Sequence, residues 1–270
     1  MVVKISEEGS TCRDLREVAE NAARILREYF DKEEYMEILG SNVTGDAMRK
    51  IDLLAEEYIV GQVRSLGLKA WVISEEKGLW KLAEQPDYYV LVDPLDGSLN
   101  YASKIPFASV SIAVYESPYS ITRPIYGVVQ SIFTETTIEI CKGKPFFNGK
   151  HLKRPFELST ELVSIYTENA RHLEELARYF ASRGVKLKTR TMGSAALEAA
   201  YAAIGLIGGF IHVTGKLRNV DIAVALALAE SLGTRFYTEP VNVRVDGVYN
   251  IEKVAISVKN SDLVNIVKHF

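Results

Sequence analysis

The sequence predicts a mixed fold, in which a mostly antiparallel α+β half is followed by an alternating α/β half. Two stretches with apolar residues at helical spacing come first, at 12–30 and 47–66. Five short β-rich runs follow, at 70–73, 87–92, 108–115, 125–130 and 136–141. Strand-like and helical segments then alternate, which is typical of an α/β layer. We therefore expect an N-terminal α+β subdomain over 1–155 and a C-terminal α/β subdomain over 156–270.

The elements of the first half follow from local patterns. Apolar residues recur every three or four positions in both helices, as on the buried face of an amphipathic helix. The runs after them, AWVI, DYYVLV, ASVSIAVY, IYGVVQ and TTIEIC, are rich in β-branched and aromatic residues. The next segment, GKPFFNGK at 143–150, contains two glycines and a proline, so we expect a turn or loop there.

The second half alternates between the two periodicities. We expect strands at 162–167, 185–189, 206–213 and 253–258, and helices at 169–182, 194–204, 219–231 and 261–269. The most apolar stretch, 195–213, is interrupted by Glu198 and His212. A bilayer span needs ~20 strongly apolar residues, so we predict a buried helix followed by a strand.

Composition narrows the class of protein. The chain has 270 residues, 47% of them hydrophobic, and its net charge of -3 gives no electrostatic case for binding nucleic acid or an anionic membrane. The N-terminus lacks the pattern of a signal peptide. The only cysteines are Cys12 and Cys141, so we expect neither a zinc site nor a disulfide scaffold. The scarcity of glutamine is typical of thermophiles. A cytoplasmic protein that binds neither nucleic acid nor membrane is expected.

The stretch DPLDGS at 93–98 ends an apolar run in two aspartates. Pro94 stiffens the backbone and has no N–H to leave unpaired, so we expect a turn that brings Asp93 and Asp96 to one point. Two carboxylates so close repel each other unless a cation lies between them, and Mg²⁺ prefers such oxygen ligands. A helix beginning at Ser98 would also point the Gly97 and Ser98 N–H groups at an anion.

Other carboxylates are candidates for the same site, and each has a simpler alternative. Glu75 and Glu76 end the strand-like run WVIS, although adjacent glutamates are usually surface charge. Asp52 lies at the edge of an apolar helix face, where it could be a solvated charge. DPLDG by itself could be a solvated turn. His212 lies in an apolar run and is interpreted as a core or edge residue.

Together these pieces resemble the inositol monophosphatase and fructose-1,6-bisphosphatase superfamily of magnesium-dependent phosphatases. DPLDGS looks like its DPxDGT/S signature, and four further pieces occur in the family's order: K-x-D-x-x-AE at 50–56, EE at 75–76, GSAAL at 193–197 and VDIAVALALAESLG at 220–233. The form LRNVD before the last aspartate looks like the archaeal branch, in which both activities can share one protein. The resemblance covers nearly the whole chain and implies a layered α-β-α-β-α sandwich of the sugar-phosphatase type.

The resemblance implies a set of metal ligands for two or three Mg²⁺. Glu75, Asp93 and the Leu95 carbonyl would hold the first ion, with Glu76 left open as an alternative to Glu75. Asp93, Asp96 and Asp221 would hold the second. The same likeness implies a homodimer.

Catalytic and substrate-binding roles are implied in the same way. Asp52, beside Ser98, would help Glu75 to position and deprotonate a metal-activated water for direct attack on phosphorus. The Gly97 and Ser98 amides would cradle the phosphate, and Ser194 and Ala195 would lie near the substrate.

The chain departs from inositol-specific members at Thr214, where those carry a glutamate that binds the ring. Lys216 and Arg218 follow, and either could hold a second phosphate or simply form ion pairs. We therefore expect hydrolysis of fructose 1,6-bisphosphate at its 1-phosphate and of inositol-1-phosphate. The alternatives are a 3′-phosphoadenosine-5′-phosphate phosphatase and a non-catalytic, metal-dependent sugar-phosphate sensor.

Overall fold

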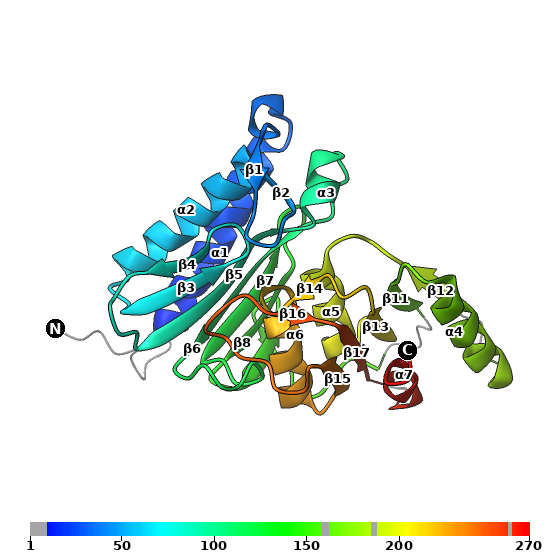
Figure 1. Ribbon diagram of the computed structural model, residues 1–270. Helices are drawn as coiled ribbons and strands as arrows, with labels where there is room; N and C mark the ends of the chain where they lie inside the picture. Colours follow the sequence, from blue (N-terminus) through cyan, green and yellow to red (C-terminus); the bar gives the residue numbers. More distant parts are fainter. Residues whose placement is uncertain (1–9, 158–161, 185–187, 259–260) are drawn as a thin grey trace.

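Five layers of secondary structure make up the fold (Figure 1). The computed structural model describes residues 10–157, 162–184, 188–258 and 261–270. Helices α1 (Ser10–Tyr29) and α2 (Lys50–Ser65) pack on one face of an eight-stranded sheet. Helices α5 (Ala195–Ile204) and α6 (Asn219–Leu232) lie between this sheet and a five-stranded one, whose other face packs against α4 (Ala170–Ser182) and α7 (Ser261–Val267). The predicted α-β-α-β-α sandwich is confirmed.

The first sheet has the strand order β10-β9-β8-β7-β6-β5-β3-β4. Neighbouring strands are antiparallel except β3 and β5, which run parallel. Because of that one parallel pair, β3 and β5 end at the same edge of the sheet, and both ends carry acidic residues. The strands are β3 (Ala70–Ser74), β4 (Gly78–Lys81), β5 (Tyr88–Asp96), β6 (Ser109–Tyr115), β7 (Tyr126–Ser131), β8 (Thr137–Cys141), β9 (Lys144–Phe147) and β10 (Lys150–His151).

The second sheet is mixed, with the order β12-β11-β13-β17-β15. Its strands are β11 (Leu162–Tyr166), β12 (Lys188–Arg190), β13 (Gly209–His212), β15 (Arg235–Glu239) and β17 (Lys253–Ser257). There are also two small two-stranded sheets: β1 (Ile38–Ser41) with β2 (Ala47–Arg49), and β14 (Leu217–Arg218) with β16 (Asn250–Ile251). The short elements η1 (Glu33–Tyr35) and α3 (Ser98–Ala102) complete the described part of the chain.

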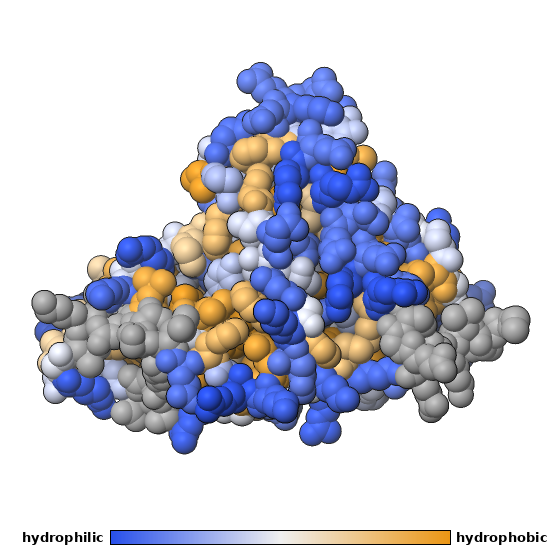
Figure 2. Space-filling model, turned by 180° about the vertical axis from the view of Figure 1, so that it is seen from behind, coloured by the Kyte–Doolittle hydropathy of each residue, from blue (hydrophilic) through white to orange (hydrophobic). Residues whose placement is uncertain are grey.

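The central helices form the core that joins the two sheets. Every residue of α6 from Asn219 to Ala229 is buried, and α5 is nearly as enclosed. A helix that is apolar all round is stable only where protein covers every side, and alanine allows close approach of the two helices. Apolar residues of both sheets pack against them in one continuous cluster. Seen from behind, the surface is largely hydrophilic, with apolar residues in smaller patches (Figure 2).

The apolar stretch 195–213 forms α5 and β13, as the sequence predicts. Among the described residues, no helix has both the length and the apolar character that a bilayer crossing requires.

Three local predictions were wrong. The segment 143–150 forms the hairpin β9–β10 instead of a loop, because Asn148 and Gly149 both have positive φ and make a tight hairpin turn. Residues 47–49 form β2, so the second helix begins at Lys50. The strands β1, β4 and β15 were not foreseen, since each is short, β1 is exposed throughout, and β4 and β15 are only partly buried. The predicted strand at 185–189 lies partly outside the described residues.

The expectation of no disulfide also needs correction, because Cys12 of α1 is bonded to Cys141 of β8 with an S–S distance of 2.07 Å. The cysteines are 129 residues apart, so only the packing of α1 on the sheet brings them together. Close by, Arg16 forms a two-pronged ion pair with the buried Glu139, which also accepts a hydrogen bond from Tyr126 at 3.1 Å. Helix α1 is thus held to the sheet by a covalent and an ionic link.

Candidate active site

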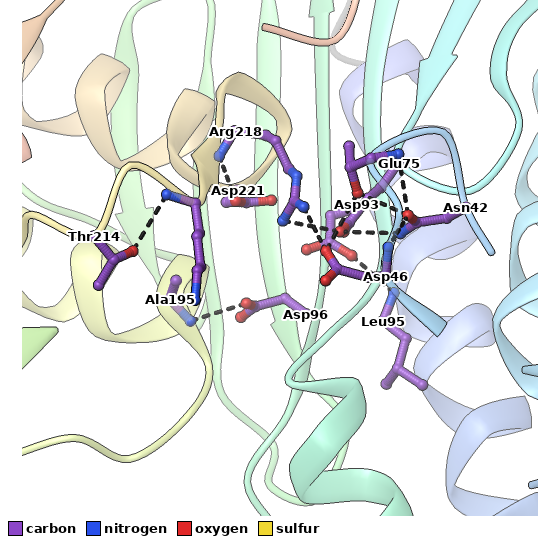
Figure 3. Close-up of polar contacts among 12 residues, drawn as sticks. Asn42, Asp46, Glu75, Asp93, Leu95, Asp96, Ala195, Thr214, Arg218 and Asp221 are labelled. Carbon is purple, nitrogen blue, oxygen red and sulfur yellow. Dashed lines mark hydrogen bonds and ion pairs between the residues drawn. The ribbon is translucent and has the colours of Figure 1, made fainter. Parts of the chain in front are cut away.

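An acidic cavity of about 400 Å³ lies where β3 and β5 end against the start of α6. Its walls come from six parts of the chain: the β1–β2 hairpin, the end of β3, the end of β5, the start of α3, the start of α5, and the segment from His212 to Asp221. Figure 3 shows the polar contacts among these side chains. The cavity therefore combines residues from both halves of the chain.

Three carboxylates converge in this cavity. Oxygens of Glu75, Asp93 and Asp221 all lie within 4.8 Å of one another. Asp93 is 2% exposed and Asp221 7% exposed. Burial, reinforced by the neighbouring carboxylates, raises the pKa of both aspartates well above the ordinary value, and burial raises the pKa of Glu75 to about 7. Three acids packed this closely resist ionisation unless a cation joins them.

The donor set fits a hard divalent cation. All three converging groups offer oxygen, the atom that such ions prefer. The Oδ1 atom of Asp52 and the Oε2 atom of Glu76 are also buried, and neither has a hydrogen-bond partner within the described ranges. Unpaired buried carboxylate oxygens are costly in the absence of positive charge. The cluster therefore has the chemistry of a metal site.

Of the two adjacent glutamates, Glu75 is the one in the cluster. Glu76 is buried, and burial with the nearby Asp52 raises its pKa to about 9, so it stays neutral near pH 7. Both glutamates lie in the turn that follows β3, and only Glu75 reaches the cluster. The geometry favours Glu75 as the ligand.

Asp96 lies at the same cavity, but its carboxylate faces the start of α5 instead of the cluster (Figure 3). It accepts hydrogen bonds from the Ala195 amide at 2.8 Å, the Ala196 amide at 3.1 Å and the hydroxyls of Ser109 and Ser194. Asp93 and Asp96 thus line one cavity, but Asp96 is not among the carboxylates that converge within 4.8 Å, and its role as a ligand stays a prediction.

A bulge explains this separation of the two aspartates. Strand β5 continues through Asp96, and three steps from Asp93 to Asp96 face only two steps from Ser111 to Ser109 on β6. The extra residue re-aims the side chains around it. Both aspartates line the cavity, but Asp93 lies in the acidic cluster, whereas Asp96 is hydrogen-bonded to the start of α5.

The comparisons with known proteins agree with this site. A family model described as the inositol monophosphatase family matches residues 11–250. The chain belongs to this family. It is 32% identical over 253 residues to the inositol-1-monophosphatase of Aeropyrum pernix, covering 91% of this chain and 90% of that one. It is 31% identical over 223 residues to the fructose-1,6-bisphosphatase/inositol-1-monophosphatase of Thermococcus kodakarensis, covering 80% and 81%.

A solved structure shares the fold over almost its entire length. It is a protein of Pyrococcus horikoshii described as having similarities to inositol-1 monophosphatase, with a TM-score of 0.75 and 26% identity, covering 95% of this chain and 98% of that one. The family membership makes the chain a phosphatase and its acidic cluster a metal-binding candidate of a metal-dependent family.

In this inositol monophosphatase family member, the turn into α3 has the predicted form. Gly97 has φ +90 and precedes the helix that begins at Ser98. A Cβ at Gly97 would lie 2.8 Å from the Gly193 carbonyl oxygen, so the position has room only for glycine. Gly97 and Ser98 both line the cavity. The turn therefore fixes the start of α3 against the loop before α5.

Asp52 lies behind the cavity, in the first turn of α2. Its Oδ2 atom accepts a hydrogen bond from the Arg49 amide at 2.7 Å, which caps the helix. Its Oδ1 atom has no partner in the described parts of the chain, so no direct bond joins that atom to Ser98. Burial raises the pKa of Asp52 to about 6. Its predicted catalytic role stays a prediction.

The predicted substrate-binding residues divide into those that line the cavity and those that support it. Ala195, Lys216 and Arg218 line it. Ser194 is fully buried and bonded to Asp96, and Thr214 accepts a hydrogen bond from the Lys216 amide at 3.2 Å. Supporting contacts of this kind are invisible in the sequence, since they depend on how two loops meet.

Arg218 forms an ion pair with the acidic cluster through Glu75. Its side chain is 14% exposed and pairs with Asp46 and, at 3.4 Å, with Glu75. Its amide also caps α6 by donating to Asp221 at 2.7 Å. Arg218 thus links the β1–β2 hairpin, the end of β3 and the start of α6.

Sequence reasoning missed four polar residues that line the cavity: Asn42, Asp46, Arg49 and His212. The polar turn SNVTGD could have indicated the first two, because Asn42 Oδ1 organises it through the amides of Thr44 and Asp46. His212 was interpreted as a core or edge residue. It is 6% exposed, stacks on Tyr166 at a ring-centroid distance of 5.0 Å, and also lines the cavity.

Proposed function

We propose that this chain is a Mg²⁺-dependent phosphomonoesterase that hydrolyses fructose 1,6-bisphosphate at its 1-phosphate and inositol-1-phosphate. The observation that carries the proposal is the convergence of Glu75, Asp93 and Asp221 within 4.8 Å at a cavity whose rim carries Lys216 and Arg218. Acidic groups at the base suit metal ions, and cations at the rim suit a second phosphate. Relatives named for both activities support this assignment.

Glu75, Asp93 and the Leu95 carbonyl would hold one Mg²⁺, and Asp93, Asp96 and Asp221 a second, with a third, weaker ion near Asp52. When bound, the metal supplies charge neutralisation for the phosphate and a lowered pKa for water. The count of two or three ions and the identity of the metal are part of the proposal.

The residues of the chain orient the substrate and handle the proton. Ser98 begins α3 beside Gly97, and both residues line the cavity, so its hydroxyl and amide would bind the phosphate. Asp52, with its raised pKa and unpaired Oδ1 atom, is suited to accept a proton relayed through Ser98. Water would attack phosphorus directly, so no phosphorylated protein would form.

The rim residues favour a bisphosphate. Lys216 is well exposed, and its partner Glu168 is equally exposed, so a substrate phosphate can replace that weak surface pair. Arg218 is already paired with two carboxylates, and we assign it mainly to holding the hairpin and Glu75. Because position 214 carries threonine, the ring of an inositol substrate would have no carboxylate partner there. We therefore expect low specificity for the leaving group.

A kinetic panel tests the proposal. Initial rates are measured with fructose 1,6-bisphosphate, inositol-1-phosphate and 3′-phosphoadenosine-5′-phosphate at millimolar Mg²⁺. We expect the bisphosphate to be cleaved at least as efficiently as inositol-1-phosphate, and one ¹⁸O atom from labelled water to enter the released phosphate. A strong preference for the nucleotide would favour the alternative phosphatase, and tight binding without turnover would favour a sugar-phosphate sensor.

The rim has its own test in a matched pair of variants. Lys216→Ala should lower kcat/KM for the bisphosphate more than for inositol-1-phosphate, because only the former has a second phosphate. Arg218→Ala should lower both, since it also releases Asp46 and Glu75. Equal effects of Lys216→Ala on the two substrates would contradict the assignment of the rim.

We also propose that the chain works in the cytoplasm as a homodimer. Large apolar side chains are exposed on and after α3, where Leu99 is 73% and Ile105 48% exposed, and a second copy would cover such residues. Sedimentation equilibrium distinguishes a dimer from a monomer. A disulfide is compatible with the cytoplasm of hyperthermophiles, in which intracellular disulfides are common.

A further inference from the structure

A second buried carboxylate lies directly behind Asp96. Glu198, in the first turn of α5, is 0% exposed. Its Oε1 atom accepts hydrogen bonds from the Ser164 hydroxyl and the Met192 amide, the latter at 3.1 Å. Its Oε2 atom accepts from the Tyr166 hydroxyl and from the amides of Gly193 at 3.0 Å and Ser194 at 3.3 Å. Five donors on one buried side chain indicate a specific structural task.

Five consecutive amides, 192–196, are shared between two carboxylates. The first three donate to Glu198, and the next two, Ala195 and Ala196, donate to Asp96. The Ser194 hydroxyl also donates to Asp96. Because one short loop donates hydrogen bonds to both carboxylates, the position of Glu198 determines where the donors to Asp96 lie.

The same loop is fixed from two other elements. The hydroxyl of Tyr166, on β11, donates to Glu198 and also accepts a hydrogen bond from the Gly193 amide at 2.9 Å. It therefore contacts both the carboxylate and the loop. Asn100 of α3 donates to the Met192 carbonyl at 2.6 Å. A Cβ at Gly193 would lie 2.5 Å from the Asn100 side chain, so the loop has little freedom to shift.

We propose that Glu198 is a positioning residue that orients Asp96 for metal binding. It holds residues 192–194 so that the two following amides fix the Asp96 carboxylate. Within the described residues, Oδ1 of Asp96 accepts one hydrogen bond, which leaves a lone pair available for a ligand. This inference rests on the proposed role of Asp96 as a ligand of the second Mg²⁺.

The variant Glu198→Gln tests the proposal with a minimal change. A glutamine keeps one acceptor oxygen, but its NH₂ group meets an amide donor where the carboxylate accepted one. Partners that orient metal ligands typically affect metal affinity by roughly 10- to 100-fold, and we expect a weakening of that size in calorimetric titration with MgCl₂ alone. Activity should recover at high Mg²⁺ with kcat near the wild-type value and little change in substrate KM.

Glu139→Gln is the matched control. Glu139 is also fully buried and accepts from Arg16 and Tyr126, but it lies in β8, outside the cavity. We expect this variant to melt at a lower temperature and to bind Mg²⁺ as the wild type does. If Glu198→Gln does not fold, Tyr166→Phe weakens the same loop by removing a single hydroxyl, and should lower Mg²⁺ affinity to a smaller extent.

A purely structural role for Glu198 predicts another result. A lower melting temperature with unchanged Mg²⁺ affinity, as in the control, would overturn the positioning role while leaving the phosphatase proposal intact. A wild-type protein that neither binds Mg²⁺ nor hydrolyses any compound of the panel would overturn the proposed function, and this inference with it.

Discussion

Asp93 is one of the most deeply buried carboxylates of the cavity. It is almost fully buried, its Oδ1 atom accepts a hydrogen bond from the Leu95 amide at 3.0 Å, and four other acids raise its pKa after burial itself. Asp221 has similar surroundings but is also held by the Arg218 amide as part of a helix cap. The two residues should therefore respond differently to loss of charge.

Asp93→Asn should nearly abolish turnover, because Asp93 is proposed to bridge two ions. Asp221→Asn should mainly raise the Mg²⁺ concentration needed for half-maximal rate. One lost charge-assisted contact is worth ~1.5–3 kcal/mol, or roughly ten- to hundred-fold in binding. Mg²⁺ titrations of both variants check this, and wild-type-like curves for either would argue against its place in the metal site.

At the residue scale, the sequence identified the acidic residues better than their orientation. Glu75, Asp93 and Asp221 were all predicted to be ligands, and they do converge. The direction of Asp96 was not foreseen, because it follows from a one-residue bulge against β6. The ion pairs of Arg218 with Asp46 and Glu75 join segments that are far apart in the sequence, so no local pattern reveals them.

At the scale of elements, tight turns and cross-links determine how helices meet the sheets. Long helical segments such as α1, α2 and α6 were predicted over most of their length, although α2 begins three residues later than expected. The short strands β1, β4 and β15 depend on contacts with other segments, so they were not predicted. The disulfide was missed for the same reason, since it requires α1 to lie across β8.

Gly97→Ala should lower both stability and turnover. Alanine there would adopt a left-handed conformation at a cost of roughly 1–2 kcal/mol, and its Cβ would meet the Gly193 carbonyl oxygen at 2.8 Å. Gly143→Ala is the control, because Gly143 has φ +72 but no atom within 4 Å of the added Cβ. Thermal melts and kcat distinguish them, and equal losses in both variants would mean that strain alone is responsible.

Removing the disulfide with Cys12→Ser and Cys141→Ser should lower the free energy of unfolding without changing the site. Linking residues 129 apart in the sequence restricts the unfolded chain, and such bonds are typically worth about 2–4 kcal/mol. Chemical denaturation measures the loss. At 25 °C, kcat/KM should match the wild-type value, and a large fall would show that the position of α1 reaches the cavity.

At the scale of the whole molecule, the acidic cavity makes stability depend on pH and metal together. Burial raises the pKa values of Asp52 and Asp96 to about 6 and that of Glu75 to about 7, above their ordinary values of 3.8 and 4.5. The folded chain therefore binds more protons than the unfolded one in this range. The contribution of these three carboxyl groups to the free energy of unfolding is complete below their ordinary pKa values. It is lost as the pH rises through their raised pKa values.

Metal-free protein should accordingly melt at a lower temperature near pH 7.5 than near pH 5. Added Mg²⁺ should raise the melting temperature much more at the higher pH, because metal ligands must be deprotonated. Differential scanning calorimetry in EDTA and in MgCl₂ at both pH values provides the measurement. An equal effect of Mg²⁺ at the two pH values would contradict the coupling between metal binding and these carboxyl groups.

The cluster draws Glu75 from the turn after β3, Asp93 from β5, and Asp221 from the central helix α6, more than a hundred positions after Asp93 in the sequence. A chain cut between β10 and β11 would consequently yield two fragments, neither of which contains all three carboxylates of the cluster. Co-expressed fragments would regain metal binding only after the central helices had docked on the first sheet. The site would then act as a split reporter, in which turnover of a phosphate ester measures the reassembly of the two pieces.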